Sequence, residues 1–170
     1  MFNMEDLADS IIKDFYNRLP KFKDGRIDYS KSNIAPVITV FVEYRGKILL
    51  LKRSSQVATY KNKWNCVAGY IDDLKPIKEK VLEELQEELS LTKQNIESIF
   101  VGKSYKFFDK AINKTWIIFP VLAKLKKETE IILDWEHESC KWIKPEEILS
   151  LDTVPSLDKT LSFVYDQKKE

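Results

Sequence analysis

The sequence contains very few side chains that bind soft metals or form disulfide bonds. Only two cysteines, Cys66 and Cys140, and a single histidine, His137, are present. The cysteines are not in C-x-x-C spacing and have no set of histidine partners, so we expect neither a zinc site nor a disulfide framework. Sparse cysteine also favours an intracellular protein, and we predict a cytoplasmic one. A single histidine excludes any mechanism that requires two.

Long hydrophobic runs and a surplus of one charge are also absent. No segment approaches the ~20 apolar residues needed to cross a membrane, and acidic residues already occur at Glu5 and Asp6, which argues against a signal peptide. The 28 Lys and Arg residues nearly balance the 27 Asp and Glu residues, for a net charge of +1. Since no general positive field attracts polyanions, we expect neither a membrane nor a sequence-specific nucleic acid as a partner.

The residues that are present suit a globular protein. The 170 residues, 44% of them hydrophobic, are enough for one domain with a substantial core. We assign residues 1–33 to an N-terminal helical extension, which caps the main domain at 34–170 or contributes to a homodimer. Interleaved helices and strands favour an α/β fold. The predicted helices are 4–18, one that begins near Pro76, a short one at 145–149, and 156–167; the predicted strands are 37–44 and 47–52, joined at Arg45-Gly46, then 64–68, 96–108 and 115–125.

The most informative segment is WNCVAGYIDDLKPIKEKVLEELQEELSL, residues 64–91. At about 100° per helical residue, Glu84, Glu87 and Glu88 fall within one arc, beside an arc of apolar residues that can pack inward. Carboxylates held this close repel one another unless a cation lies among them, and Mg²⁺ is the most natural ion for oxygen ligands. The alternative is a solvated acidic face, in which Lys80 pairs with Glu84 at i, i+4.

The same segment resembles the signature of the Nudix hydrolase family, G-x5-E-x7-R-E-U-x-E-E-x-G-U, in which U is a bulky aliphatic residue. Three positions depart from it: Lys75 replaces the first glutamate, Glu83 the arginine, and Ser90 the second glycine. The other six of the nine defined positions agree, and they are Gly69, Glu84, Leu85, Glu87, Glu88 and Leu91.

The resemblance extends over about residues 35–165. Upstream, 36–53 resembles a hairpin that leads through a polar loop to Trp64. Downstream, an acidic loop precedes WIKPEEIL at 142–149, which is similar to the family's Trp-containing strand and short helix. The resemblance implies a Nudix-type α/β/α sandwich with a mixed β-sheet. It also implies a Mg²⁺-dependent, or alternatively Mn²⁺-dependent, hydrolase that cleaves a diphosphate linkage in a small nucleotide-derived substrate.

The resemblance also implies roles for residues around the turn and helix. Glu87 and Glu88 would be the principal metal ligands, and Glu84 would bind metal or act as the catalytic base. The backbone carbonyl of Ala68 would complete the set of ligands. A carbonyl ligand depends little on the side chain, so alanine is acceptable where the family usually has glycine.

A further carboxylate is expected from the acidic loop. Glu136 lies six residues before Trp142, as the late glutamate of the family does, although Asp134 and Glu138 are equally near. His137 either touches a phosphate or the base, or is an ordinary surface histidine.

Substrate contacts are expected from basic and aromatic side chains near the entrance. The basic ones can bind phosphate oxygens and the aromatic ones can stack on a nucleobase. The alternatives are solvation for the former and burial in the core for the latter. The basic set is Lys52, Arg53, Lys61 and Lys63, and the aromatic set is Tyr105, Phe107 and Phe108.

The departures from the signature leave two other hypotheses open. Glu83 adds negative charge beside the glutamate that the family's arginine orients, and Lys75 places an ammonium where a carboxylate assists metal binding. The first alternative is therefore a catalytically impaired, Nudix-like nucleotide-binding module. The second is an isopentenyl diphosphate isomerase-like enzyme, which needs a cysteine just before the turn. This chain has Ala68 there, with Cys66 two residues earlier.

Overall fold

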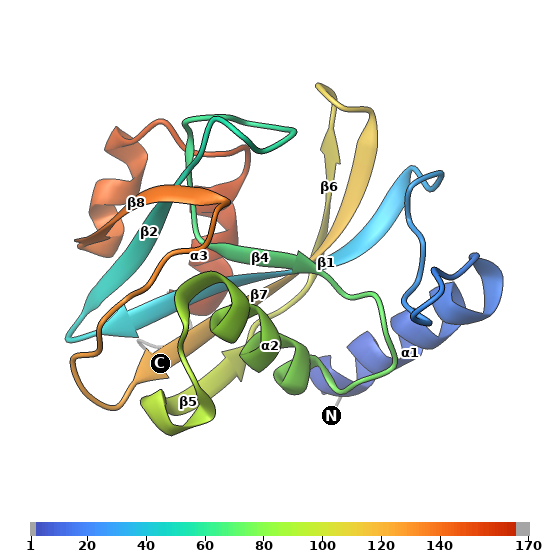
Figure 1. Cartoon of the computed structure of the whole chain (residues 1–170), viewed down its shortest axis with the longest axis horizontal. Helices are drawn as coiled ribbons and strands as arrows, with labels where there is room; N and C mark the ends of the chain where they lie inside the picture. Colours follow the sequence, from blue (N-terminus) through green and yellow to red (C-terminus); the bar gives the residue numbers. More distant parts are fainter. Residues whose placement is uncertain (1–2, 166–170) are drawn as a thin grey trace.

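The computed structural model describes residues 3–165, whose helices surround one mixed β-sheet (Figure 1). The helices are α1 (Met4–Arg18), α2 (Ile77–Leu89) and α3 (Leu157–Tyr165), with 3₁₀ helices η1 (Lys93–Asn95) and η2 (Pro145–Ser150). The strands are β1 (Ile34–Tyr44), β2 (Lys47–Arg53), β3 (Trp64–Asn65), β4 (Val67–Tyr70), β5 (Ile96–Val101), β6 (Tyr105–Asp109), β7 (Lys114–Leu125) and β8 (His137–Ile143).

Two long parallel strands form the middle of the eight-stranded sheet. β1 and β7 pair from Ile34↔Thr115 to Glu43↔Lys124. β1 also pairs with β2 and β4, β7 pairs with β5 and β6, and β2 pairs with β3 and β8, in each case antiparallel. This mixed sheet confirms the α/β class predicted from the sequence.

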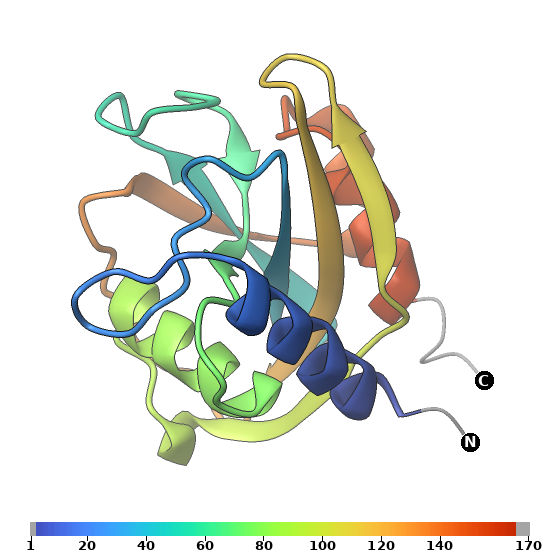
Figure 2. The ribbon, with the colours of Figure 1, turned by 90° about the vertical axis from the view of Figure 1, so that its right-hand side faces the viewer.

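Helices cover both faces of the sheet, as Figure 2 shows. On one face, Ile12 of α1 and the α2 residues Val81 and Leu85 share a core with β1 and β7. On the other face, Leu161 of α3 and Ile148 of η2 share a second core with Phe41 of β1. Because successive strand residues point to opposite faces, a strand as apolar as β1 contributes to both cores.

Two predicted strands are each divided in the structure. The strand predicted over 64–68 is two short strands with different partners, since β3 pairs with β2 and β4 pairs with β1. The strand predicted over 96–108 is interrupted around Gly102, between β5 and β6. A Cβ atom at this position would lie 2.7 Å from the carbonyl oxygen of Phe163. Glycine therefore allows the chain to pass directly against α3.

The remaining predicted elements agree closely with the structure. The helix at 4–18 and the hairpin at Arg45-Gly46 are confirmed, and the two turn residues have φ values of +49° and +78°, as such two-residue hairpins require. The short helix predicted at 145–149 is the 3₁₀ helix η2. The helix predicted at 156–167 is α3, and its last two predicted residues lie outside the described part.

The two ends of α2 explain one departure from the Nudix signature. Pro76 immediately precedes the helix, where its missing N–H costs no hydrogen bond. At the other end, Ser90 adopts the left-handed conformation with φ of 57°, and its N–H donates to the Gln86 carbonyl at 3.0 Å. Glycine is the usual residue in this conformation. Ser90 therefore takes the helix-ending conformation that glycine usually supplies, and it is not among the described residues that line the cavity.

α1 packs beside α2 and extends the first core (Figure 1). Its residues Ala8, Ile12 and Phe15 are buried, and Glu5 forms a 2.8 Å ion pair with Lys78 of α2. The helix thus covers one end of the core. A role in a homodimer, and the separation of an N-terminal extension from the main domain, stay predictions. Within the described part of the chain, none of the helices is long and apolar enough to cross a membrane.

Candidate metal centre and active site

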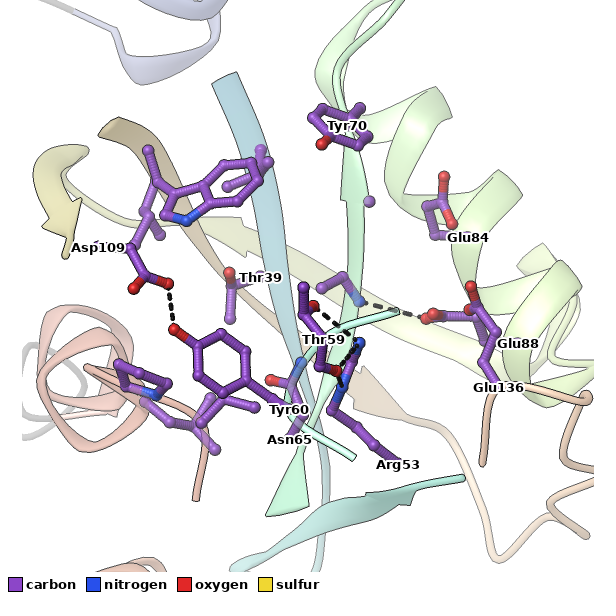
Figure 3. Close-up of a pocket in the computed structure, with 18 of the residues that line it drawn as sticks. Thr39, Arg53, Thr59, Tyr60, Asn65, Tyr70, Glu84, Glu88, Asp109 and Glu136 are labelled. Atoms are coloured by element: carbon purple, nitrogen blue, oxygen red, sulfur yellow. Dashed lines mark hydrogen bonds between the residues drawn. The ribbon is translucent and has the colours of Figure 1, made fainter. Parts of the chain in front are cut away.

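A cavity of about 500 Å³ opens beside β4 and α2, and its two ends differ in chemistry. Figure 3 shows Glu84, Glu88 and Glu136 at one end, and Asp109 with Tyr60 at the other. The acidic end combines α2 with the loop between β7 and β8. The other end combines the loop after β2 with the turn between β6 and β7.

Glu88 forms the buried base of the acidic end. Only 4% of this residue is exposed, and one of its carboxylate oxygens accepts a hydrogen bond from the backbone N–H of Ala68 at 3.2 Å. Burial raises the pKa of Glu88 well above its ordinary value, and a hydrogen bond with Glu136 and the charges of Glu136 and Glu84 raise it further. No lysine or arginine forms an ion pair with Glu88 among the described residues, although the charge of Arg53 acts on it from the cavity wall.

The strand β4 presents backbone groups to the same cluster. Because the N–H and C=O of one strand residue point to the same edge, the Ala68 carbonyl faces α2 as its N–H does. The next residue, Gly69, lies directly under Glu84, and a Cβ atom there would come within 2.5 Å of the Glu84 carboxylate. The glycine of the signature is therefore needed so that Glu84 can lie against the strand.

Glu84 and Glu87 complete the acidic end. The Glu84 side chain is 15% exposed, and burial raises its pKa to about 7 despite the lowering effect of Lys80. Glu87 is exposed and lines the cavity mouth. The interpretation as a solvated acidic face thus fits Glu87 but not Glu84 or Glu88. Carboxylates at the first, fourth and fifth positions of one helical stretch, with a carbonyl opposite, are a suitable oxygen donor set for a divalent cation.

A buried lysine lies immediately beside this donor set. Lys80 is 5% exposed, and its ammonium lies 2.8 Å from Asp72, 3.4 Å from Glu83 and 4.0 Å from Glu84. Burial acts to lower the pKa of Lys80, but the hydrogen bond to Asp72 and the surrounding carboxylates outweigh it and raise the pKa. The alternative interpretation as a solvated face paired Lys80 with Glu84, and in the structure Asp72 is the nearer partner.

The two charged departures from the signature contact each other. Lys75 and Glu83 form an ion pair and a hydrogen bond. The signature has glutamate at the first of these positions and arginine at the second, so this chain reverses both charges and keeps an opposite-charge pair. The negative charge of Glu83 is therefore directed to Lys75 and Lys80, away from the centre of the acidic cluster.

The loop before β8 and the first residue of that strand, His137, contribute to the same region. Glu136 lines the cavity, as does Asp134, whereas Glu138 is exposed and pairs with Lys52 at 3.3 Å. His137 is not a surface residue as one interpretation expected: it is 6% exposed, and its Nδ1 lies 3.1 Å from Asp134. Burial lowers the pKa of His137, although Asp134 acts to raise it.

The far end of the cavity was missed by sequence reasoning. Buried Asp109 accepts hydrogen bonds from the Tyr60 hydroxyl and from the Ala111 N–H, the latter at 3.1 Å. Tyr70 and Trp116, which also line the cavity, form an aromatic wall with ring centroids 5.7 Å apart. These residues carry no shared spacing in the sequence, because β4, β6 and β7 bring them together only in the folded chain.

The predicted substrate residues fall into two groups. Arg53 and Phe107 line the cavity. The Arg53 guanidinium donates to the Thr59 carbonyl at 3.0 and 2.8 Å. Burial lowers the pKa of Arg53, although the charges of Glu136 and Glu88 act to raise it. Among the described residues, the cavity lining does not include Lys52, Lys61 or Lys63, and Lys63 pairs with Asp152 at 2.7 Å. Phosphate binding by these lysines stays a prediction.

The other two aromatic residues of the predicted set point elsewhere. Tyr105 stacks on Phe163 of α3 at 4.8 Å and hydrogen-bonds to Thr160 at 2.6 Å. Phe108 is 51% exposed. Alternation along β6 explains the position of Phe108, which lies on the face opposite to Phe107. Tyr105 shares the face of Phe107 but lies against α3.

The fold and the acidic end together correspond to a known family. A family model described as the NUDIX domain matches residues 33–163, and the chain belongs to the Nudix family. This match confirms the resemblance drawn from the signature and its flanking segments. A search of curated proteins finds no match.

Solved structures with the same fold come from distant organisms. A MutT protein from Methanosarcina mazei Go1 is 22% identical, with a TM-score of 0.64 over 81% of this chain and 96% of that one. A MutT NUDIX hydrolase from Burkholderia pseudomallei is 20% identical, with a TM-score of 0.63 over 77% and 98%. A C. elegans Ap4A hydrolase is 19% identical, with a TM-score of 0.60 over 80% and 97%. At these identities the likeness concerns the fold alone.

Proposed function

We propose that the protein is a divalent-metal-dependent hydrolase that cleaves a diphosphate linkage in a nucleotide-derived substrate. The observation that carries the proposal is the burial of Glu84 and Glu88 together beside Glu136 and the Ala68 backbone, at one end of a cavity. Buried carboxylates held close to one another are costly, and a bound divalent ion offsets that cost.

The residues of the acidic end suit this reaction. When bound, Mg²⁺ or Mn²⁺ supplies charge neutralisation for phosphate oxygens and activation of a water. Glu87, Glu88, Glu136 and the Ala68 carbonyl would hold the ion. Glu84, placed over Gly69 at the cavity wall, would accept the proton of the attacking water or join the ligands.

The rest of the cavity suits a nucleotide. The aromatic wall of Tyr70 and Trp116 offers a stacking surface, and Phe107 lines the same space. Asp109 and Tyr60 offer hydrogen bonds to polar edges at the end away from the glutamates. A ligand that extends from a diphosphate to a base matches this order of groups.

The proposal is tested with Glu88→Gln, which keeps the shape of the side chain and removes its charge. Turnover in Mg²⁺ or Mn²⁺ is measured against nucleoside triphosphates, dinucleoside polyphosphates including Ap4A, nucleotide sugars and ADP-ribose. We expect the variant to lose at least about a hundredfold in kcat on the best substrate, as loss of a central catalytic interaction does. Glu79→Gln on the exposed side of α2 is the matched control and should retain activity. Unchanged turnover in Glu88→Gln would refute the assignment.

A second candidate is a nucleotide-binding module without hydrolysis, favoured by the reversed charges at positions 75 and 83. It predicts nucleotide binding in calorimetry with no product after long incubation. The double variant Lys75→Glu, Glu83→Arg restores the signature at both positions. Activity that appears only in this variant would favour the binding module.

The isopentenyl diphosphate isomerase-like hypothesis gains no support from the position of the nearest thiol. Cys66 is 1% exposed and packs in the core on the α3 side of the sheet. Absence of conversion of isopentenyl diphosphate would complete the case against it.

A further inference from the structure

We propose that His137 is a nitrogen ligand to the divalent ion of this site, together with Glu88 and Glu136, and that this donor set favours Mn²⁺ over Mg²⁺. The inference rests on the proposed function for the presence of an ion at these glutamates. It adds a ligand of a different chemical type and, with it, a choice of metal.

The three side chains converge from two parts of the chain. One ligand atom from each of Glu88, Glu136 and His137 lies within 4.8 Å of the others. Atoms bound to one ion at about 2.0–2.2 Å lie at most about 4.4 Å apart, so small side-chain rotations are sufficient for all three to bind together. The Asp134 N–H also donates to the Glu88 carbonyl at 3.2 Å, which fastens the loop to the end of α2.

Asp134 fixes the orientation of the imidazole ring. Its Oδ1 atom lies 3.1 Å from His137 Nδ1 and also accepts the Glu136 N–H at 3.2 Å. Since a carboxylate partner favours the tautomer with the proton on Nδ1, the lone pair is left on Nε2. A carboxylate behind a histidine in this way is the usual support of a histidine that binds a metal.

The burial of His137 places it on the protein side of the site. Its side chain is 2% exposed, and it is not among the described residues that line the cavity. A ligand in this position leaves the cavity side of the ion free for phosphate oxygens and water. Glu84 and Glu87, which do line the cavity, keep their places on that open side.

The chemical types of the ligand atoms determine which divalent ion the site prefers. Carboxylates and carbonyls suit Mg²⁺, which binds oxygen in strict octahedral geometry, whereas an imidazole nitrogen suits later and softer divalent ions. Mn²⁺ accepts carboxylates and imidazole together. One nitrogen among the oxygen ligands therefore shifts the preference from Mg²⁺ toward Mn²⁺.

The test uses the fact that the chain contains a single histidine. Mn²⁺ is added to the full chain without a histidine tag, and electron spin-echo envelope modulation is recorded for ¹⁴N coupled to the bound ion. We expect an imidazole nitrogen signal, which in this chain can come only from His137. Mn²⁺ that is bound at the site and shows no nitrogen coupling would overturn the inference and leave the proposed hydrolase function intact.

A variant at His137 separates the effect of its metal-binding nitrogen from that of its contact with Asp134. His137→Asn keeps an amide near the position of Nδ1, which can still bond to Asp134, and lacks Nε2. We expect its Mn²⁺ affinity in calorimetry to fall by about tenfold or more, with a change of less than about threefold for Mg²⁺. Equal losses for both ions would contradict the inference. If Mn²⁺ binds native protein and Glu88→Gln equally, the metal site of the proposed function fails along with it.

Discussion

The two ends of the acidic face of α2 differ in how their charges are balanced. Toward the start of the helix, Glu83 forms ion pairs with Lys75 and Lys80, and Lys80 also forms one with Asp72. Near its end, Glu88 is buried against Glu136 with no lysine or arginine ion pair among the described residues. The same side-chain type is therefore used in a closed ion-pair network at one end and left unbalanced at the other.

The difference separates carboxylates that are balanced by lysines of the chain from a buried carboxylate that is not. A carboxylate whose partner is a lysine needs no external ion. A buried carboxylate whose nearest polar neighbours are other carboxyl groups is destabilising until a cation arrives. Reversal of the signature charges at Lys75 and Glu83 falls in the balanced part, and the cavity glutamates keep their arrangement. The two charged departures from the signature thus lie in the supporting network rather than at the proposed ion position.

The largest expected effect comes from removal of the centre of the balanced network. Lys80→Met leaves Asp72, Glu83 and Glu84 without their buried cation, and we expect it to lower the free energy of unfolding by about 3–5 kcal/mol. Lys80→Arg should retain most of that stability. Lys78→Met, which removes an exposed lysine from the same helix, should cost less than about 1 kcal/mol. Urea unfolding measures all three, and similar losses at positions 78 and 80 would contradict the contrast.

The buried carboxyl group of Glu84, which lies between the two ends, predicts a pH dependence with a definite sign. Because burial raises the pKa of Glu84 to about 7, the folded chain holds a proton that the unfolded chain releases. Without metal, the contribution of this group to stability is constant below about pH 4.5 and is lost as pH rises toward 7, by up to about 3 kcal/mol. The measurement is the stability difference between native protein and Glu84→Gln in a chelator, across that range.

A bound divalent ion should restore the stability that is lost as pH rises. An ion that binds only the folded state at about 100 times its dissociation constant adds about 2.7 kcal/mol at pH 7. Native protein that loses no stability relative to Glu84→Gln as pH rises in the chelator, or that gains none from Mn²⁺ or Mg²⁺, would show that the acidic end is already balanced.

The smallest effect concerns the reversed pair. Lys75→Glu and Glu83→Arg each place like charges side by side, and each should cost about 0.5–1 kcal/mol because the pair is largely exposed. The double variant restores opposite charges and should recover most of that loss. A double-mutant cycle in thermal unfolding measures the coupling energy. Additive losses would mean that the contact between positions 75 and 83 contributes nothing.

Much of α2 was predictable because helical periodicity acts over short distances. The spacing of Glu84, Glu87 and Glu88 placed them on one face, and the apolar positions beside them predicted which face packs inward. The glycine before the helix was also a local signal, and Gly69 does lie against Glu84, although it is part of β4 and not of the turn that the sequence predicted. The strand pair at Arg45-Gly46 was predicted on the same basis, since two turn residues determine it.

Contacts between distant segments were not predictable in this way. Glu136 was one of three acidic residues in a loop until β8 paired with β2 and brought it against Glu88. The Tyr60–Asp109 contact joins residues 49 positions apart. No spacing rule relates such positions, because strand order and register decide them.

The sequence alone therefore determined the family, the helix and the face of the helix that carries the acidic residues, since each depends on periodicity or on a continuous motif. The tertiary structure decided which of those charges are balanced. Lys75 and Lys80 lie close to Glu83, and Asp134 holds the only histidine beside Glu88 and Glu136. Charge balance depends on distances and burial in three dimensions, and neither follows from the order of residues along the chain.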